Sequence, residues 1–293
     1  MTNEGSIVRK LTLILLISFL AGCQSDEVPF DSTAESALEA TAQEHIDDSP
    51  VASPVVVPEP ARPVIEQNIA YGEAGNRNLV GYLTMPADVV EPQPGVLIIH
   101  EWWGLNDNIK AMARRIAGEG FVVLAVDLYD GVTAELPGEA QNLMAQVMGA
   151  PEATIDNVSQ GIQYLSRYAL APRVASLGWC LGGTWSLQAA FSAGDELDAM
   201  VMYYGQVSTD EAQLETLDLP ILGFFGGQDA SIPLAEVQRF RTTLTRLGKD
   251  SQVRIYPDAD HAFANPSGGN YNAEAATDAW ERTLEFLNRT LRL

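Results

Sequence analysis

The sequence predicts one α/β domain in which a mostly parallel, eight-stranded sheet is covered by helices on both faces. From about Val64 onward, short apolar runs alternate with longer segments of helical periodicity. This alternation is typical of parallel sheets, because a helix carries the chain back to the start of each next strand. Residues 64–293 are enough for a single domain of this class.

The apolar runs predict strands over Asn68–Tyr71, Val80–Met85, Val96–His100, Val122–Asp127, Val174–Gly178, Ala199–Tyr204, Ile221–Gly226 and Gln252–Tyr256. The segments of helical periodicity predict helices over Asp107–Gly118, Ala140–Met148, Glu152–Ala169, Thr184–Ala193, Leu234–Leu247 and Ala273–Arg289. In the first of these helices Ile109, Met112 and Ile116 share one face, and Asn106 or Asp107 can cap its start.

Cys180 lies in a motif that is typical of a catalytic nucleophile. The motif Gly178-Trp179-Cys180-Leu181-Gly182-Gly183 joins a predicted strand to a predicted helix. It has the form of the nucleophile elbow G-x-S-x-G, with Cys in place of Ser. Glycines permit the sharp turn, and the start of the helix offers backbone N–H groups to an anion. A buried, inert structural cysteine is the alternative that this motif alone leaves open.

Two later strand ends supply a candidate acid and a candidate base. Asp229 follows one predicted strand and His261 follows the next. The chain order of nucleophile, acid and histidine is that of α/β hydrolases. We therefore expect Cys180 to be the nucleophile, His261 the general base and then acid, and Asp229 the group that orients the imidazole. Asp258 and Asp260 are alternative acids, but their closeness to His261 in sequence favours turn roles.

The loop after the predicted strand Val96–His100 completes the expected site. The backbone N–H groups of Trp102 and Leu181 are the expected oxyanion hole. Glu101 is expected to hydrogen-bond the thiol and to hold it unreactive until substrate displaces it; an ordinary solvated carboxylate is the alternative. The third histidine, His45, falls in a polar N-terminal segment that is expected to be disordered.

Six motifs occur in family order: residues 100–106 (HEWWGLN), 127–129 (DLY), 178–183 (GWCLGG), 203–205 (YYG), 226–229 (GGQD) and 261–264 (HAFA). With these motifs, residues 65–293 resemble the dienelactone hydrolase (carboxymethylenebutenolidase-like) family, a cysteine branch of the α/β hydrolases. The resemblance implies the α/β-hydrolase fold and a triad of Cys180, His261 and Asp229, with Glu101 facing the elbow. It also implies hydrolysis of a small ester or lactone through a thioester acyl-enzyme, with no metal or organic cofactor.

The sequence departs from the family where the substrate carboxylate is held. Dienelactone-cleaving members use arginines there, one of them four residues after the catalytic histidine, where this chain has Asn265. Between Asp127 and Ser166 the chain has no Arg or Lys. A carboxylate buried without a charged partner is costly, so we expect an uncharged ester or lactone. Aromatic residues flank the motifs, and we expect at least half of them to be core: Trp102, Trp103, Tyr129, Trp179, Trp185, Tyr203, Tyr204 and Phe263.

The N-terminus predicts export and a lipid anchor. Arg9 and Lys10 precede a short apolar run, Leu11–Leu20, which is too short to span a membrane. The ending Leu20-Ala21-Gly22-Cys23 resembles a bacterial lipobox, which implies a signal peptide over residues 1–22 and lipidation of Cys23. An ordinary signal peptide is the alternative. Residues 24–63 are acidic and Pro-rich and are expected to form a disordered tether. If the host has two membranes, the periplasmic side of the outer membrane is the expected location.

Composition narrows the class of partner. The formal net charge of −22 disfavours nucleic acid and anionic lipid surfaces. With Cys23 acylated, Cys180 would be the one remaining thiol, so no disulfide is expected. Two functions remain: a membrane-tethered cysteine hydrolase of small esters or lactones, or a catalytically retired α/β-hydrolase domain that serves as an envelope binding or scaffold module. Acyl transfer to an acceptor other than water is a variant of the first, and the oligomeric state is left open.

Overall fold

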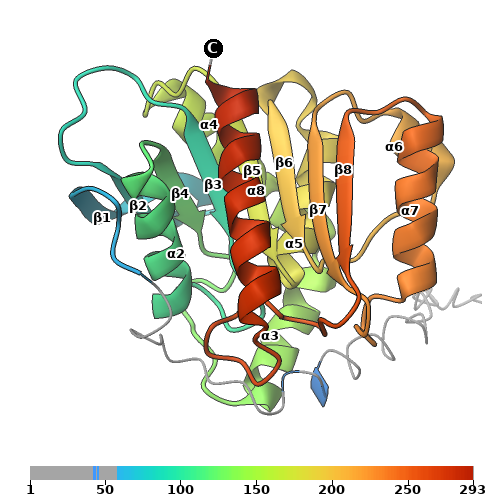
Figure 1. Cartoon of the computed structure of the whole chain (residues 1–293). Coiled ribbons are helices and arrows are strands. Elements are labelled where there is room, and N and C mark those ends of the chain that lie inside the picture. The colour runs from blue at the N-terminus through green and yellow to red at the C-terminus, as the bar shows by residue number, and fades with distance from the viewer. Residues whose placement is uncertain (1–41, 44, 46–57, 293) are drawn as a thin grey trace, which may run out of the picture.

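A central eight-stranded sheet organises the protein in the computed structural model, which describes residues 42, 43, 45 and 58–292 (Figure 1). The strands are β1 (Val64–Ala74), β2 (Arg77–Pro86), β3 (Gly95–Ile99), β4 (Val122–Val126), β5 (Val174–Trp179), β6 (Ala199–Tyr203), β7 (Ile221–Gly226) and β8 (Ser251–Tyr256). Their order across the sheet is β1-β2-β4-β3-β5-β6-β7-β8. The predicted signal peptide, Cys23 and most of the predicted tether lie outside the described residues.

The sheet is parallel from β4 to β8, and β2 is antiparallel to both β1 and β4. Parallel strands end at the same edge, so the loops after β3, β4, β5, β6, β7 and β8 all meet there. Every residue of β3, β4, β5, β6 and β7 is buried, as expected for strands that are covered on both faces. This edge is where the sequence places its candidate catalytic residues.

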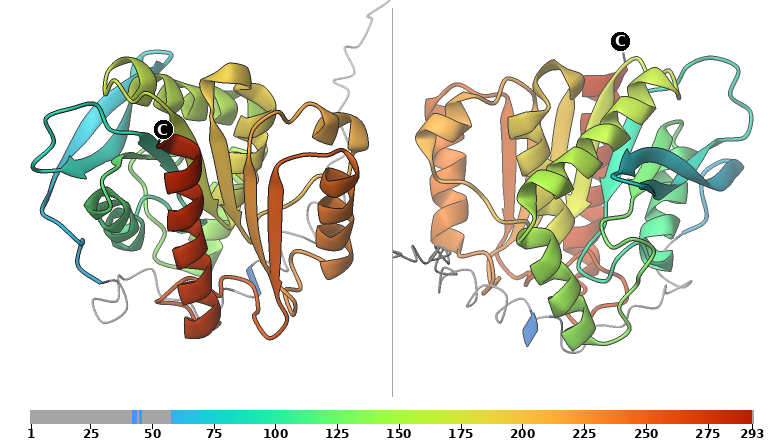
Figure 2. Two further views of the ribbon diagram at one scale, coloured as in Figure 1. Left: turned by 45° about the horizontal axis from the view of Figure 1, so that its top comes forward. Right: turned by 180° about the vertical axis from the view of Figure 1, so that it is seen from behind.

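Helices cover both faces of the sheet. They are α2 (Asp107–Gly118), α3 (Pro137–Met148), α4 (Pro151–Arg167), α5 (Leu181–Ser192), α6 (Glu211–Glu215), α7 (Leu234–Arg246) and α8 (Ala273–Leu291), with a 3-10 turn, η1, over Gly194–Glu196. α2 and α8 lie on the face toward the viewer in Figure 1, whereas α4 and α5 cover the opposite face (Figure 2). The α/β-hydrolase fold that the sequence predicts is thereby confirmed.

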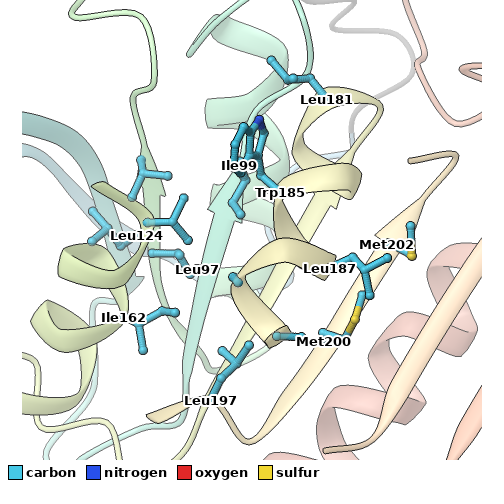
Figure 3. Close-up of a cluster of buried hydrophobic side chains, with 14 of the residues drawn as sticks. Leu97, Ile99, Leu124, Ile162, Leu181, Trp185, Leu187, Leu197, Met200 and Met202 are labelled. Carbon is cyan, nitrogen blue, oxygen red and sulfur yellow. The ribbon is translucent and has the colours of Figure 1, made fainter. Parts of the chain in front are cut away.

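Successive side chains of β3 point to opposite faces of the sheet and so belong to two separate core clusters, one on each face. Leu97 and Ile99 join the cluster that packs beneath α4 and α5, whereas Val96 and Ile98 join the one beneath α2 and α8. All four side chains are fully buried, which contributes roughly 1.5–3 kcal/mol for each. Figure 3 shows the first cluster, in which Leu181 and Trp185 anchor the start of α5. The helix that follows Cys180 is thus fixed by the core.

All eight predicted strands and six predicted helices are present, with ends shifted by a few residues. The largest difference is β1, predicted as Asn68–Tyr71 but eleven residues long. Its outer residues pair with β2 in an edge hairpin and are largely exposed, so they lack an apolar signature. The short elements α6 and η1 were not predicted from the sequence.

Of the two candidate caps of α2, Asn106 is the cap, because its Oδ1 accepts from the Ile109 N–H at 3.1 Å. Within the described part of the chain, no helix combines the length and the apolar character that a membrane span requires.

Candidate active site

Cys180 occupies a strained turn between β5 and α5. Its backbone angles are φ 52° and ψ −118°, a conformation that residues with a side chain rarely adopt. The turn is anchored because the Cys180 N–H donates to the Tyr203 carbonyl at 3.0 Å and the Thr184 N–H donates to the Cys180 carbonyl at 3.1 Å. The side chain is 4% exposed. The strained elbow that the motif predicts is therefore present.

Two glycines of the motif are required by close backbone contacts. A Cβ on Gly178 would lie 2.1 Å from the Gly182 carbonyl oxygen, and a Cβ on Gly182 would lie 2.0 Å from the Ile99 carbonyl oxygen. Both neighbours are backbone atoms, which cannot move aside as a flexible side chain can. Without a side chain at Gly178 the strand can turn directly into α5, and without one at Gly182 the elbow can lie against the end of β3.

We expect Gly182→Ala to destabilise the fold by about 3 kcal/mol, because the new methyl group overlaps the end of β3. The measurement is the free energy of unfolding in urea. Gly138→Ala is the matched control, since a Cβ there meets nothing within 4 Å and α3 gains a better helix former. The control should fall within about 1 kcal/mol of wild type, on the stabilising side. Equal stability of the two variants would contradict the close approach.

His261 and Asp229 form a buried hydrogen-bonded pair. His261 Nδ1 lies 2.8 Å from Asp229 Oδ2, and both side chains are almost fully buried. The other oxygen of Asp229 accepts from the Ile232 N–H at 2.7 Å, which fixes the carboxylate. Asp258 is exposed, and Asp260 accepts from the backbone N–H of His261 instead of from its ring. Of the three candidate acids, Asp229 is the one placed to orient the imidazole.

Electrostatics favour a thiolate beside an imidazolium. Burial alone would raise the pKa of Cys180, but His261, with a smaller contribution from His45, outweighs it and lowers that pKa to about 6. Burial lowers the pKa of His261, whereas the charges of Asp229 and Cys180 raise it, and its pKa lies well above the ordinary value. At neutral pH the pair is therefore mainly charged, with the proton on the imidazole.

We expect the thiolate of Cys180 to appear as the pH rises through about 6, because the folded-state pKa of this acid is lowered. An ordinary cysteine would ionise near pH 8.5. The measurement is the ultraviolet absorbance of the thiolate against pH, taken as wild type minus Cys180→Ser, so that Cys23 cancels. A midpoint above pH 8 would contradict the charged pair.

The loop after β3 is held by His100. This ring is fully buried, and its Nδ1–H donates to the Glu101 carbonyl at 2.7 Å while its Nε2 accepts from the Leu128 N–H at 3.0 Å. The acceptor role of Nε2 requires the neutral ring, in agreement with the lowered pKa that burial gives it. Tyr129 adds a bond from its hydroxyl to the Trp102 carbonyl at 3.1 Å. His100 therefore acts as a structural residue that ties the loops after β3 and β4 together.

Glu101 is buried and not a solvated surface carboxylate. It is 3% exposed, and Asn265 Nδ2 lies 3.4 Å from its Oε1. Asn265 is itself buried and accepts from the Ser267 N–H at 2.9 Å. The Asn265 amide is thus engaged with Glu101. The sequence signalled Asn265 only as a departure from the family pattern.

The two expected oxyanion-hole residues flank the nucleophile's turn. Leu181 is the first residue of α5, directly after Cys180, and Trp102 lies in the loop after β3. Gly182 brings the elbow against this loop, since its Cα faces the backbone of Ile99 and His100. The eight flanking aromatic residues are all buried. The Tyr204 ring contacts the His261 ring edge-on and also contacts the Phe263 ring.

His45 is the residue whose place the sequence did not predict. It was expected to lie in a disordered tether, but its side chain is fully buried in the site, which corrects that expectation for this residue. Its Nε2 lies 3.7 Å from Cys180 Sγ. Its ring stacks on Trp102 with centroids 4.6 Å apart and meets the His261 ring edge-on at 5.1 Å. No motif marks His45, since its contacts join positions 135 residues apart in sequence.

The sequence matches one family model and is similar to several curated proteins. The family model described as "Dienelactone hydrolase family" matches residues 79–291. A Saccharolobus solfataricus protein named "Putative carboxymethylenebutenolidase" is 31% identical over 264 residues, which cover 77% of this chain and 99% of the relative. "Protein usf" of Aquifex pyrophilus is 33% identical over 205 residues, which cover 68% of this chain and 89% of the relative.

Solved structures agree on the fold. A dienelactone hydrolase-like promiscuous phosphotriesterase, P91, from metagenomic libraries superposes with a TM-score of 0.69 at 22% identity, covering 78% of this chain and 98% of the other. The acylaminoacyl peptidase of Pyrococcus horikoshii gives a TM-score of 0.63 at 16% identity, covering 78% of this chain and 42% of the other. At these identities the likeness supports the α/β-hydrolase fold alone.

Proposed function

Because the chain belongs to the dienelactone hydrolase family, we propose that it hydrolyses small esters or lactones through a covalent intermediate on Cys180. The observation that carries the proposal is the buried constellation of Cys180, His261 and Asp229 at one edge of the sheet, with Asp229 on His261 Nδ1 at 2.8 Å. A thiolate next to an oriented imidazolium is the arrangement that nucleophilic acyl transfer requires.

The proposed reaction has two stages. The Cys180 thiolate attacks the ester carbonyl, and the oxygen that becomes negative is stabilised by the backbone N–H groups of Trp102 and Leu181. The C–O bond then breaks, the alcohol leaves with the proton from His261, and a thioester remains on Cys180. In the second stage His261 takes a proton from water and the hydroxide attacks the thioester. The C–S bond then breaks, the carboxylic acid leaves, and the Cys180 thiolate is regenerated beside the protonated His261.

We propose uncharged substrates instead of dienelactone, which carries a carboxylate. Two observations support this choice: Asn265 replaces the family arginine and is bonded to Glu101, and residues 64–293 carry an excess of acidic side chains. The test compares kcat/KM for an uncharged unsaturated lactone and for its carboxylate-bearing analogue. The uncharged lactone should be favoured by at least about 10-fold, since the carboxylate lacks a charged partner. Preference for the carboxylate would overturn this assignment of substrate class.

We expect Glu101→Ala to raise the reactivity of Cys180 toward iodoacetamide. The proposed reason is that the buried carboxylate accepts a hydrogen bond from the protonated thiol and so competes with the thiolate–imidazolium pair until substrate displaces it. The measurement is the second-order rate of alkylation at Cys180, followed by peptide mass spectrometry. Glu119→Ala, at the C-cap of α2 and so at the end of the helix away from the loop that carries Glu101, is the control and should react as wild type. Equal or lower reactivity of Glu101→Ala would remove the restraining role.

The competing function is a catalytically retired domain that binds a ligand in the cell envelope. The complete constellation of charged catalytic groups favours the enzyme.

Acyl transfer to an alcohol or amine acceptor would proceed through the same thioester as hydrolysis. Adding acceptors to the assay distinguishes the two reactions: a rate that saturates with acceptor, with formation of the new ester or amide, would favour transfer over hydrolysis.

We propose that the protein is exported and anchored to the bacterial envelope through lipidated Cys23. The observation behind this is the sequence Leu20-Ala21-Gly22-Cys23 after a basic and apolar leader. Metabolic labelling with a radioactive fatty acid tests it. Label should enter wild type and not Cys23→Ser, and labelling of both or of neither would contradict the anchor.

A further inference from the structure

Three side chains of types that ligate metals meet at the candidate active site, and one of them is outside the proposed catalytic mechanism. The donor atoms of His45, Cys180 and His261 all lie within 4.8 Å of one another, and all three residues are buried. Catalysis as described above uses Cys180 and His261 and leaves His45 without a role. His45 is buried next to Cys180 although the two residues are 135 positions apart in the sequence, so a function for this imidazole is sought below.

The donor set is one that zinc prefers. A thiolate and two imidazoles suit Zn²⁺, and three protein ligands with one open position are common in zinc sites. In a tetrahedral site the sulfur and a nitrogen lie about 3.6 Å apart, given Zn–S of about 2.3 Å and Zn–N of about 2.0–2.1 Å. The observed 3.7 Å between Cys180 Sγ and His45 Nε2 agrees with this spacing. Donors that lie up to 4.8 Å apart need to approach by up to about 1.2–1.5 Å to reach the tetrahedral spacing.

The surroundings support each imidazole as a ligand. His261 Nδ1 is held by the Asp229 carboxylate at 2.8 Å, which directs Nε2 toward Cys180, and a carboxylate behind a ligating histidine strengthens metal binding. The His45 ring is held by Trp102, on which it stacks at an interplanar angle of 29°. Ala42, three residues earlier, packs against the core cluster that contains Trp102. In Figure 1 this short stretch, in blue, lies at the edge of the sheet that carries the site.

We propose that His45, Cys180 and His261 form a zinc site that closes the catalytic centre, so that zinc reversibly inhibits the enzyme. Coordination uses the sulfur that attacks the substrate and the imidazole nitrogen that moves the proton. It also holds the His45 ring over the nucleophile, where the substrate carbonyl must lie. The inhibition rests on the proposed hydrolase function, whereas metal binding itself does not.

Binding is tested on the full chain in detergent with Co²⁺ as a spectroscopic substitute for Zn²⁺. Wild type should bind one Co²⁺ per chain and show the near-ultraviolet charge-transfer band of a cobalt thiolate. Cys180→Ser should lose the band, and His45→Gln should bind at least about 10-fold more weakly. Gln43→Ala is the matched control from the same stretch: its side chain is exposed, so its binding should equal that of wild type. No thiolate band in wild type, or equal affinity in His45→Gln, would overturn the three-ligand site.

Inhibition is tested by the hydrolysis of p-nitrophenyl acetate at increasing free Zn²⁺. Each variant is compared with itself without metal, so changes in its basal rate cancel. The Zn²⁺ concentration for half inhibition should rise at least about 10-fold in His45→Gln, and EDTA should restore the rate in wild type. Equal zinc sensitivity of wild type and His45→Gln would contradict the role of His45. If no chain hydrolyses the ester without metal, the proposed function fails, and the Co²⁺ spectra still decide the metal site.

Discussion

Replacing Cys180 by Ala is expected to lower kcat for ester hydrolysis by at least about 10³-fold, which corresponds to about 4 kcal/mol of activation free energy. The methyl group of Ala cannot form the thioester, so only the oxyanion hole and substrate binding remain to accelerate the reaction. The fold should persist because Ala removes a single buried sulfur atom and leaves the glycines of the elbow in place.

Two measurements accompany this variant. The melting temperature should stay within a few degrees of wild type, which separates loss of chemistry from loss of fold. Cys23→Ser is the matched control, since it removes the other cysteine of the chain and should keep wild-type kcat on a soluble ester. Unchanged hydrolysis by Cys180→Ala would show that Cys180 is not the nucleophile. Loss of hydrolysis in Cys23→Ser would indicate that the reaction depends on Cys23 instead.

Asp229→Asn is expected to lower kcat by about 10²–10⁴-fold with a smaller effect on KM. The carboxylate accepts from His261 Nδ1–H and raises the pKa of that imidazole, so that it can hold the proton which the leaving alcohol needs. An amide removes the charge and can present its NH₂ group to the ring, which favours the wrong tautomer. The bond from the Ile232 N–H can still be accepted by the amide oxygen, so the loop after β7 should keep its conformation.

The controls for Asp229 come from its two sequence competitors. Asp258→Asn should retain wild-type kcat because that side chain is exposed. Asp260→Asn keeps an oxygen that can accept from the His261 backbone N–H and should also retain activity. A large loss in Asp258→Asn together with an active Asp229→Asn would reverse the assignment of the acid.

Much of the fold and the candidate triad could be predicted from local signals. The strands β3 and β4 are continuous apolar runs, and β5 is one interrupted by Ser176; all three end in polar or glycine-rich loops, so both their type and their ends are visible in the sequence. Cys180 can be recognised in the sequence by the glycines on either side of it. These positions must be glycine because of close contacts with β3 and with the first turn of α5. Asp229 and His261 follow strand ends in the order that this fold requires.

The parts that were not predicted depend on contacts between distant segments. The outer residues of β1 become a strand only through pairing with β2, since their own side chains are largely exposed. His45 lies in an acidic, polar stretch, and nothing in its neighbours indicates that its ring stacks on Trp102. The bond between Asn265 and Glu101 joins residues 164 positions apart. No periodicity or motif encodes such contacts.

The most direct test of the central claim is a rapid-mix reaction of the full chain with p-nitrophenyl acetate, quenched in acid for mass spectrometry. We predict a burst of p-nitrophenol of up to one per chain, and a single acetyl group on the peptide that contains Cys180. Iodoacetamide should abolish both. Turnover without acetylated Cys180, or a burst that survives in Cys180→Ala, would contradict a cysteinyl acyl-enzyme.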